Sequence, residues 1–154
     1  MRLVRLLVLF VFALGFSYYG FSEEAERIAK IVDLKGQVQL KSLQGDWVPA
    51  EVGTTLTQGH ILKTAAKSQA VLKLDGAEET ATVEINENSQ LMLSELLMDT
   101  EKGTQKTLLD LAIGKVLIKA QKLHDEKSKF EVKTPTSIVG VRGTSFSVEV
   151  EATE

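Results

Sequence analysis

The chain has 154 residues, enough for one domain and a short appendage, and 44% of them are hydrophobic, which is sufficient for one core. Its 18 basic and 21 acidic residues give a formal net charge of −3, which argues against a nucleic-acid binder, because such proteins usually carry a basic surplus. The absence of cysteine excludes disulfides and a lipid-modified N-terminal cysteine.

The N-terminus has the layout of a secretory signal peptide. Two arginines precede the apolar run Leu6–Phe16, and Gly20 and Ser22 stand at positions −3 and −1 of a cleavage site. The run is shorter than the roughly 20 residues of a membrane span. We therefore predict a cleaved signal peptide over residues 1–22 and an exported, periplasmic or otherwise extracytoplasmic chain. Contact with a membrane is expected only through this segment, if it stays uncleaved as an anchor.

A polar leader is expected over residues 23–30, followed by one β domain over 31–150 and a tail over 151–154. Apolar residues alternate with polar ones in short runs, and turn signals recur about every ten residues, as in a sandwich, barrel or roll. The prediction is all-β: a single sandwich-like or roll-like domain of short strands. The expected strands lie at residues 31–34, 38–41, 47–50, 60–64, 70–74, 83–85, 91–93, 108–111, 116–120, 130–132 and 146–150.

Two features of this pattern stay open. Leu93–Met98 reads equally as a buried strand or a helical turn, because the run is short. Gly36–Ser42 and Gly114–Ala120 share the order Gly, polar, Val, any residue, aliphatic, Lys, small. They either occupy related positions in a pseudo-repeated roll or resemble each other by coincidence.

No constellation of catalytic or metal-binding residues stands out. The only histidines, His60 and His124, lie in turn and loop sequence without a motif around them, and no His/Asp/Glu cluster has zinc spacing. Glu78–Glu79 and Glu84–Glu87 are expected to be solvated charge rather than an acid and base pair. Residues 139–143 contain two glycines but no Lys-Ser/Thr pair follows, so they do not form a phosphate loop. We expect no catalytic residue, cofactor or metal, and therefore a non-enzyme.

Trp47 is the only tryptophan, between Gly45-Asp46 and the ladder-breaking Pro49. We expect it to be a plug that closes one end of the core. An exposed platform for a sugar or a partner is the alternative.

The most informative stretch is Thr134–Val150. Its second half alternates strictly, with Phe146, Val148 and Val150 on one face. Its first half starts with proline, is punctuated by glycine and holds one arginine, Arg142. A buried guanidinium must be paired, so we expect Arg142 to bond backbone carbonyls or a carboxylate across a turn. Recognition of a ligand is the alternative.

Lysines are concentrated in Lys115–Lys133, which has six of them against three acidic residues. We expect solvated strand faces here, with contact to an anionic envelope polymer as the alternative.

The chain resembles the FecR-like domain, a bacterial extracytoplasmic module, because its motifs appear in family order. These include Gly36-x-Val38, Gly45-Asp46-Trp47-x-Pro49-Ala50, Gly53-x-x-Leu56-x-x-Gly59-x-Ile61, Leu109-x-Leu111-x-x-Gly114-x-Val116, Thr134-Pro135-Thr136 and Gly140-Val141-Arg142-Gly143-Thr144-x-Phe146-x-Val148. Ten family-motif residues are expected to be structural: Trp47, Pro49, Thr134, Pro135, Gly140, Val141, Arg142, Gly143, Thr144 and Phe146.

The resemblance implies an all-β extracytoplasmic domain. In the best-known members this domain belongs to a transmembrane regulator that senses a ligand-loaded outer-membrane receptor and controls a sigma factor. Only five residues precede the apolar run here and four follow Val150, so we expect the domain without the regulator's other parts. The predicted function is a binding or interaction module of the cell envelope, with an envelope protein or polymer as partner. The alternative is the sensor component of iron-uptake-type envelope signal transduction, working with a separate membrane regulator.

Overall fold

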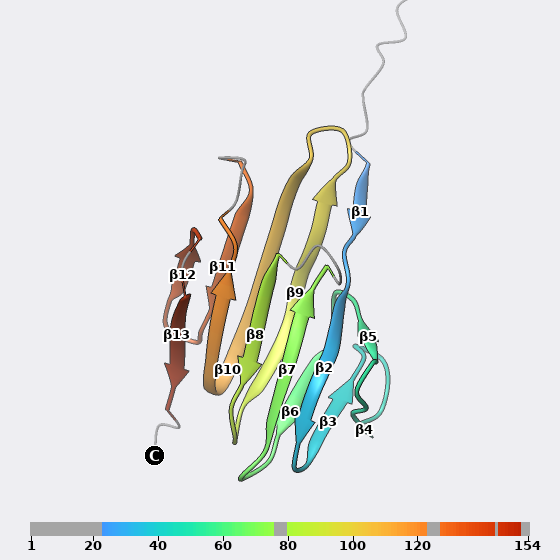
Figure 1. The fold of residues 1–154 in the computed structure, drawn as a ribbon, viewed down its shortest axis with the longest axis vertical. Coiled ribbons are helices and arrows are strands. Elements are labelled where there is room, and N and C mark those ends of the chain that lie inside the picture. The colour runs from blue at the N-terminus through green and yellow to red at the C-terminus, as the bar shows by residue number, and fades with distance from the viewer. Residues whose placement is uncertain (1–22, 76–79, 123–126, 144, 152–154) are drawn as a thin grey trace, which may run out of the picture.

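A computed structural model describes residues 23–75, 80–122, 127–143 and 145–151, and every regular element in these ranges is a strand (Figure 1). The predicted all-β class is confirmed. The described residues contain no helix long and apolar enough to cross a membrane. The predicted signal peptide, His124, Glu78–Glu79 and Thr144 lie outside the described residues, as does most of the predicted tail.

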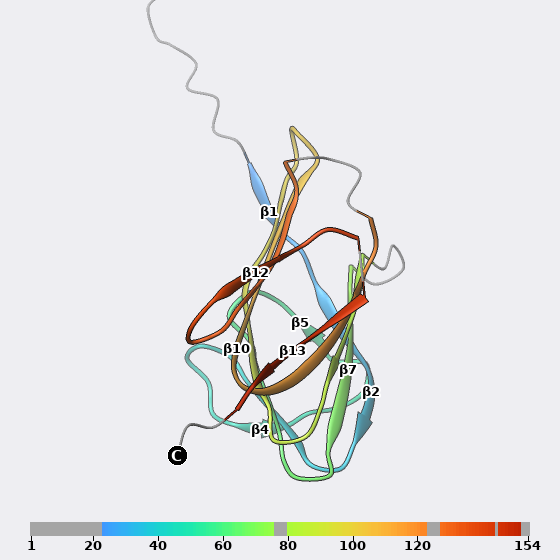
Figure 2. The same ribbon diagram turned by 90° about the vertical axis from the view of Figure 1, so that its left-hand side faces the viewer.

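The strands form one curled sheet that makes two layers. The first layer runs in the order β4 (Val48–Pro49), β3 (Val38–Lys41), β6 (Ile61–Thr64), β9 (Gln90–Asp99), the first half of β10 (Thr104–Ala120), β11 (Lys129–Lys133) and β12 (Ile138–Val141), with β1 (Glu24–Glu26) beside the far end of β9. The second runs β5 (Thr55–Leu56), β2 (Ala29–Lys35), β7 (Gln69–Leu74), β8 (Ala81–Ile85), the second half of β10, and β13 (Ser145–Val150). Figure 2 shows β10 curving from one layer to the other.

Four neighbouring chain segments pass between the layers at one end, which we call the fold line: residues 36–37, 65–68, 86–89 and 114–115. Each passage contains one residue with positive φ, namely Gly36, Lys67, Asn88 and Gly114. Backbone hydrogen bonds connect adjacent passages, from Ala65 N–H to the Gln37 carbonyl at 3.0 Å and from Asn86 N–H to the Lys115 carbonyl at 2.9 Å. The fold line is therefore a continuous corner of a single sheet.

Two buried serines explain why glycine occupies the outer passages. A Cβ on Gly36 would collide with Ser68, and one on Gly114 would collide with Ser89. Ser68 Oγ accepts from Gln37 N–H at 2.9 Å, and Ser89 Oγ accepts from Lys115 N–H at 3.0 Å. The similar runs Gly36–Ser42 and Gly114–Ala120 thus start at equivalent corners, which supports the first of the two interpretations of their likeness.

The core lies between the layers and follows the predicted alternation. In β7 every second residue is buried, and the same holds in β8. Each fully buried aliphatic side chain contributes about 1.5–3 kcal/mol relative to its exposure to water. The largest fully buried side chains are Ile31, Leu56, Leu62, Leu72, Leu74, Ile85, Leu91, Leu93, Leu96, Leu109, Leu111 and Ile118.

The structure decides one open strand prediction and changes two others. The ambiguous run Leu93–Met98 is strand, within β9. The two strands expected on either side of Gly114 are one bent strand, β10, because the glycine turns the chain without ending its ladder. The predicted leader over residues 23–30 contains β1, paired with β9, and the start of β2, where Ala29 is fully buried. β-structure therefore begins before residue 31.

Candidate protein-binding edge

The family-motif segment starts with a tight turn between β11 and β12. Thr134 N–H donates to the Ser137 carbonyl at 2.8 Å, and Ser137 N–H donates to Thr134 Oγ1 at 3.0 Å. Thr134 is buried, whereas Pro135 and Thr136 are exposed. The side chain of Thr134 thus replaces a backbone acceptor within this turn.

Among the described residues, β12 is the last strand of the first layer and pairs with β11 on one side only. Its outer side chains are apolar and exposed: Ile138 by 63% and Val139 by 37%. Val141 is buried against the core. β12 therefore offers water a short row of unpaired backbone groups beside apolar side chains.

The register tells which backbone groups face outward. Val132 pairs with Val139 and Phe130 with Val141, and the Ser137 carbonyl already faces β11. Because N–H and C=O groups of an antiparallel strand point to alternate sides, those of Ile138 and Gly140 face away from β11. An incoming strand can bond to these two residues without disturbing the existing ladder.

The other described edge strands are blunted by means that proteins commonly use. β1 carries Glu24 and Glu26, β4 contains Pro49, and β5 has only two residues. In β13 the apolar side chains face the core, and Ser145, Ser147 and Glu149 face outward. β12 has neither a charge nor a proline.

The two glycines of the motif differ in what the fold requires of them. Gly143 has φ of +63°, and a Cβ there would lie 2.9 Å from Lys122 Cα. A Cβ on Gly140 would meet nothing within 4 Å, and its φ lies outside the left-handed range. The folded chain therefore explains Gly143 but gives no reason for Gly140. A glycine in a strand often marks the close approach of another backbone.

The remaining motif residues separate into two places. Phe146 packs partly buried against the core from β13, as its alternation predicted. Arg142 is exposed, so the expectation that its guanidinium is buried is wrong, whereas its expected bond across a turn stays a prediction. The residue follows the edge strand directly and lies beyond the core.

Trp47 and Pro49 lie at the opposite end of the first layer, around β4. Trp47 is 37% exposed and lies outside the core cluster, so the expectation of a core plug is wrong. Its ring lies 6.0 Å from Lys41 Nζ, a cation–π geometry. The core cluster consists of aliphatic side chains and Phe130, without the indole. The structure thus does not bring Trp47 together with the Thr134–Phe146 motif.

The lysine-rich segment is largely neutralised by strands distant in sequence. Lys115 pairs with Glu149 at 3.0 Å, Lys119 with Glu84 at 2.8 Å and Lys133 with Asp110 at 3.3 Å. At least three of its six lysines are therefore in ion pairs with carboxylates of neighbouring strands. This supports the interpretation as solvated strand faces over that of a polymer-binding patch.

The described residues contain no group of three His, Cys, Asp or Glu side chains placed to hold a metal ion. His60 has a local role, since its Nδ1 lies 3.2 Å from Thr57 N and can accept from this N–H within a turn. A shallow groove of about 540 Å³ does lie between the Thr134–Ser137 turn and the end of β13. Its lining combines aliphatic and hydroxyl groups with two acidic residues, Glu149 and Glu151.

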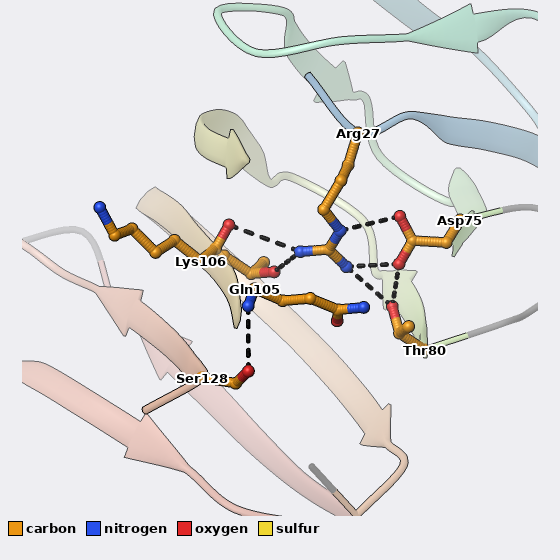
Figure 3. A network of polar contacts seen from close by, with 7 residues as sticks. Arg27, Asp75, Thr80, Gln105, Lys106 and Ser128 are labelled. Carbon is orange, nitrogen blue, oxygen red and sulfur yellow. Dashed lines mark hydrogen bonds and ion pairs between the residues drawn. The ribbon is translucent and has the colours of Figure 1, made fainter. Parts of the chain in front are cut away.

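One buried polar network escaped the sequence analysis, because Arg27 falls in the predicted leader. Its side chain is 6% exposed and forms a two-pronged ion pair with Asp75, at 2.9 Å for the Nε–Oδ1 contact (Figure 3). Arg27 Nη1 also donates to Thr107 Oγ1 at 2.8 Å, and Nη2 to Thr80 Oγ1 at 3.0 Å. The network ties the β1–β2 link to the β7–β8 connection and to β10.

An exposed ion pair holds β1 nearby. Lys106 Nζ lies 2.8 Å from Glu24 Oε1, and this hydrogen bond, together with the carboxylate charge, raises the pKa of Lys106 above 10.5. A raised folded-state pKa stabilises the fold below the ordinary pKa, and this contribution is lost as the pH rises through the raised value.

A family model described as FecR protein matches residues 60–154, which include β6 to β13. The match contains the Thr134–Phe146 motif and does not reach Trp47 and Pro49. No curated protein and no solved structure matches the chain.

Proposed function

The chain belongs to the FecR family, and we propose that it is a non-enzymatic interaction module of the cell envelope that accepts a strand of a partner protein at β12. A FecR domain points to a role related to envelope signal transduction, and the family is associated with the cell envelope. The N-terminal signal-peptide pattern supports export.

The exposed edge of β12 carries this proposal. Strand addition gains affinity from main-chain hydrogen bonds, and pockets or apolar side chains of the edge supply specificity. β12 provides outward-facing backbone at Ile138 and Gly140 and exposed apolar side chains at Ile138 and Val139. A protein partner therefore fits this edge better than an anionic polymer.

The test places a photo-crosslinking amino acid at Ile138 in the full chain, in cells. The matched control is Val52, which is 60% exposed and lies between β4 and β5, away from β12. We expect adducts with an envelope protein from position 138 and none from position 52. Gly140→Pro, which removes an outward-facing N–H, should abolish them. Equal labelling from both positions, or no adduct with any protein, a second copy of this chain included, would overturn the proposal.

A second candidate, favoured by the family match itself, is a sensor that works with a separate membrane regulator. Deletion of the gene should then change transcription of a defined gene set. If the transcript profile is unchanged while the crosslinks at position 138 persist, the interaction module stands without the sensor.

A further inference from the structure

We infer that β12 pairs with β12 of a second copy of this chain, antiparallel and centred on Val139, so that the first layer continues across two copies. This inference names the partner of the proposed edge and so rests on the proposed function. It is carried by the self-complementarity of residues 138–141 in backbone and shape.

The backbone complementarity follows from the alternation along β12. The N–H and C=O groups of Ile138 and Gly140 point outward, whereas those of Val139 between them point toward β11. In an antiparallel pair about a two-fold axis at Val139, Ile138 of one copy lies opposite Gly140 of the other. All outward-facing donors and acceptors of both residues then find partners. Two-fold pairing is also the commonest closed arrangement of two identical chains.

The side chains fit the same register. Each exposed Ile138 lies opposite a Gly140, where a built Cβ meets nothing within 4 Å. The missing side chain leaves space for the isoleucine, which is a reason for Gly140 that the single chain lacks. On the other face Val139 meets its own copy, at a Cα separation of about 4.5 Å for a non-hydrogen-bonded pair. Its partner on β11, Val132, is fully buried, so this contact extends the core.

The charges on the outer face are compatible with this register. Lys133 is the neighbour of Ile138 on β11, and Glu131 is the neighbour of Gly140. Across the two-fold axis, each Lys133 therefore lies in the row of a Glu131 of the other copy, roughly 14 Å away at three strand spacings. An antiparallel pair thus places no like charges in one row, whereas a parallel pair would align lysine with lysine. A four-residue edge buries little area, so the association is weak and depends on concentration.

The chain has no cysteine, which makes cysteine crosslinking a direct test of register. In the full chain, the two cysteines of the Val139→Cys dimer would have their Cα atoms about 4.5 Å apart, within the range for a disulfide. The two cysteines of an Ile138→Cys dimer would be diagonal neighbours across the strand pair, with Cα atoms about 7–8 Å apart, outside that range. Under a mild oxidant we expect the Val139→Cys dimer to form at least about tenfold faster than the Ile138→Cys dimer. Val52→Cys lies after β4, at the opposite edge of the first layer, and should form disulfide dimers only at the rate of random collisions.

Two more measurements keep the test decisive. Gly140→Pro in the Val139→Cys background should abolish the fast dimer, and a circular dichroism melt shows whether that variant still folds. If Gly140→Pro unfolds, Ile138→Lys serves in its place, because a charge at the edge opposes strand pairing. Equal rates for all three cysteine positions, or no Val139→Cys dimer, would overturn the inference. If the dimer is absent but photo-crosslinks to another envelope protein persist, only this inference fails; if both are absent, the proposed function fails as well.

Discussion

The fold line and the β12 edge use small residues in opposite circumstances. At the fold line, Gly114 has φ of +95° and a serine lies where its side chain would be, and every passage is connected to its neighbour by hydrogen bonds. At β12, Gly140 has open space around it and apolar neighbours that face water. The fold of the single chain therefore requires a glycine at position 114. At position 140 the single chain does not require one, and the proposed strand pairing provides a reason for it.

The comparison predicts that substitutions at interior junctions destabilise the fold, whereas those at the β12 edge alter association and leave stability nearly unchanged.

The largest effect is expected at the buried ion pair. Asp75→Ala leaves the Arg27 guanidinium buried without its carboxylate, and we expect a loss of about 3–5 kcal/mol in the free energy of unfolding. The control is the exposed motif arginine, since Arg142→Ala should cost below about 1 kcal/mol. Urea titration measures both. The double variant Arg27→Met with Asp75→Leu should recover part of the loss, and equal losses for Asp75→Ala and Arg142→Ala would contradict the contrast.

The glycines test the comparison directly. Gly114→Ala forces a left-handed residue and a collision with Ser89, and we expect a loss of about 2–4 kcal/mol. Gly140→Ala should change the free energy of unfolding by less than about 0.5 kcal/mol, because its Cβ enters open space. Thermal unfolding followed by circular dichroism ranks the two variants, and a reversed order would remove the distinction between fold line and edge.

A smaller effect is expected at the serine of the fold line. Ser89→Ala leaves Lys115 N–H without its acceptor, which costs about 1–3 kcal/mol for a buried donor. Ser147→Ala on the outer face of β13 is the matched control, and its effect should stay within about 0.5 kcal/mol. Amide hydrogen exchange at Lys115 should speed up in the first variant alone. Unchanged protection there would show that another group satisfies the amide.

The smallest effect is expected at Trp47. Its exposed indole predicts emission near that of tryptophan in water and quenching by iodide. Trp47→Phe should shift the free energy of unfolding by less than about 1 kcal/mol, since a cation–π contact at an exposed site, such as that with Lys41, is worth about 0.5–1 kcal/mol. A strongly blue-shifted spectrum that iodide does not quench would instead support Trp47 as a buried plug of the core.

Much of the strand pattern was predictable from local sequence. In β13, the face formed by Phe146, Val148 and Val150 turns to the core as its alternation predicts. The corner at Gly114 was visible as a strand break, though not as a bend, because local sequence does not tell whether a ladder continues through a glycine. The candidate site was predicted in part: the motif was visible, and the exposure of its first half was not.

Residues whose role depends on distant partners were misjudged or missed. Arg27 looked like part of a polar leader, and its partner Asp75 lies 48 residues away. Arg142 and Trp47 were expected to be buried because of their immediate neighbours. The lysines of residues 115–133 are expected to be solvated strand faces, but their pairing is not visible in the sequence, because the carboxylates that pair with three of them come from other strands.

The sequence by itself determined the all-β class, the alternation of the strands and the family, because these depend on period-two patterns and on ordered motifs along the chain. Only the tertiary structure decided which strands become neighbours, which edge remains unpaired and which arginine is buried. The physical reason is that alternation specifies the face of a strand on which a side chain lies. It does not specify what lies opposite that face or beside that strand, and ion pairs, corners and free edges are set by those neighbours.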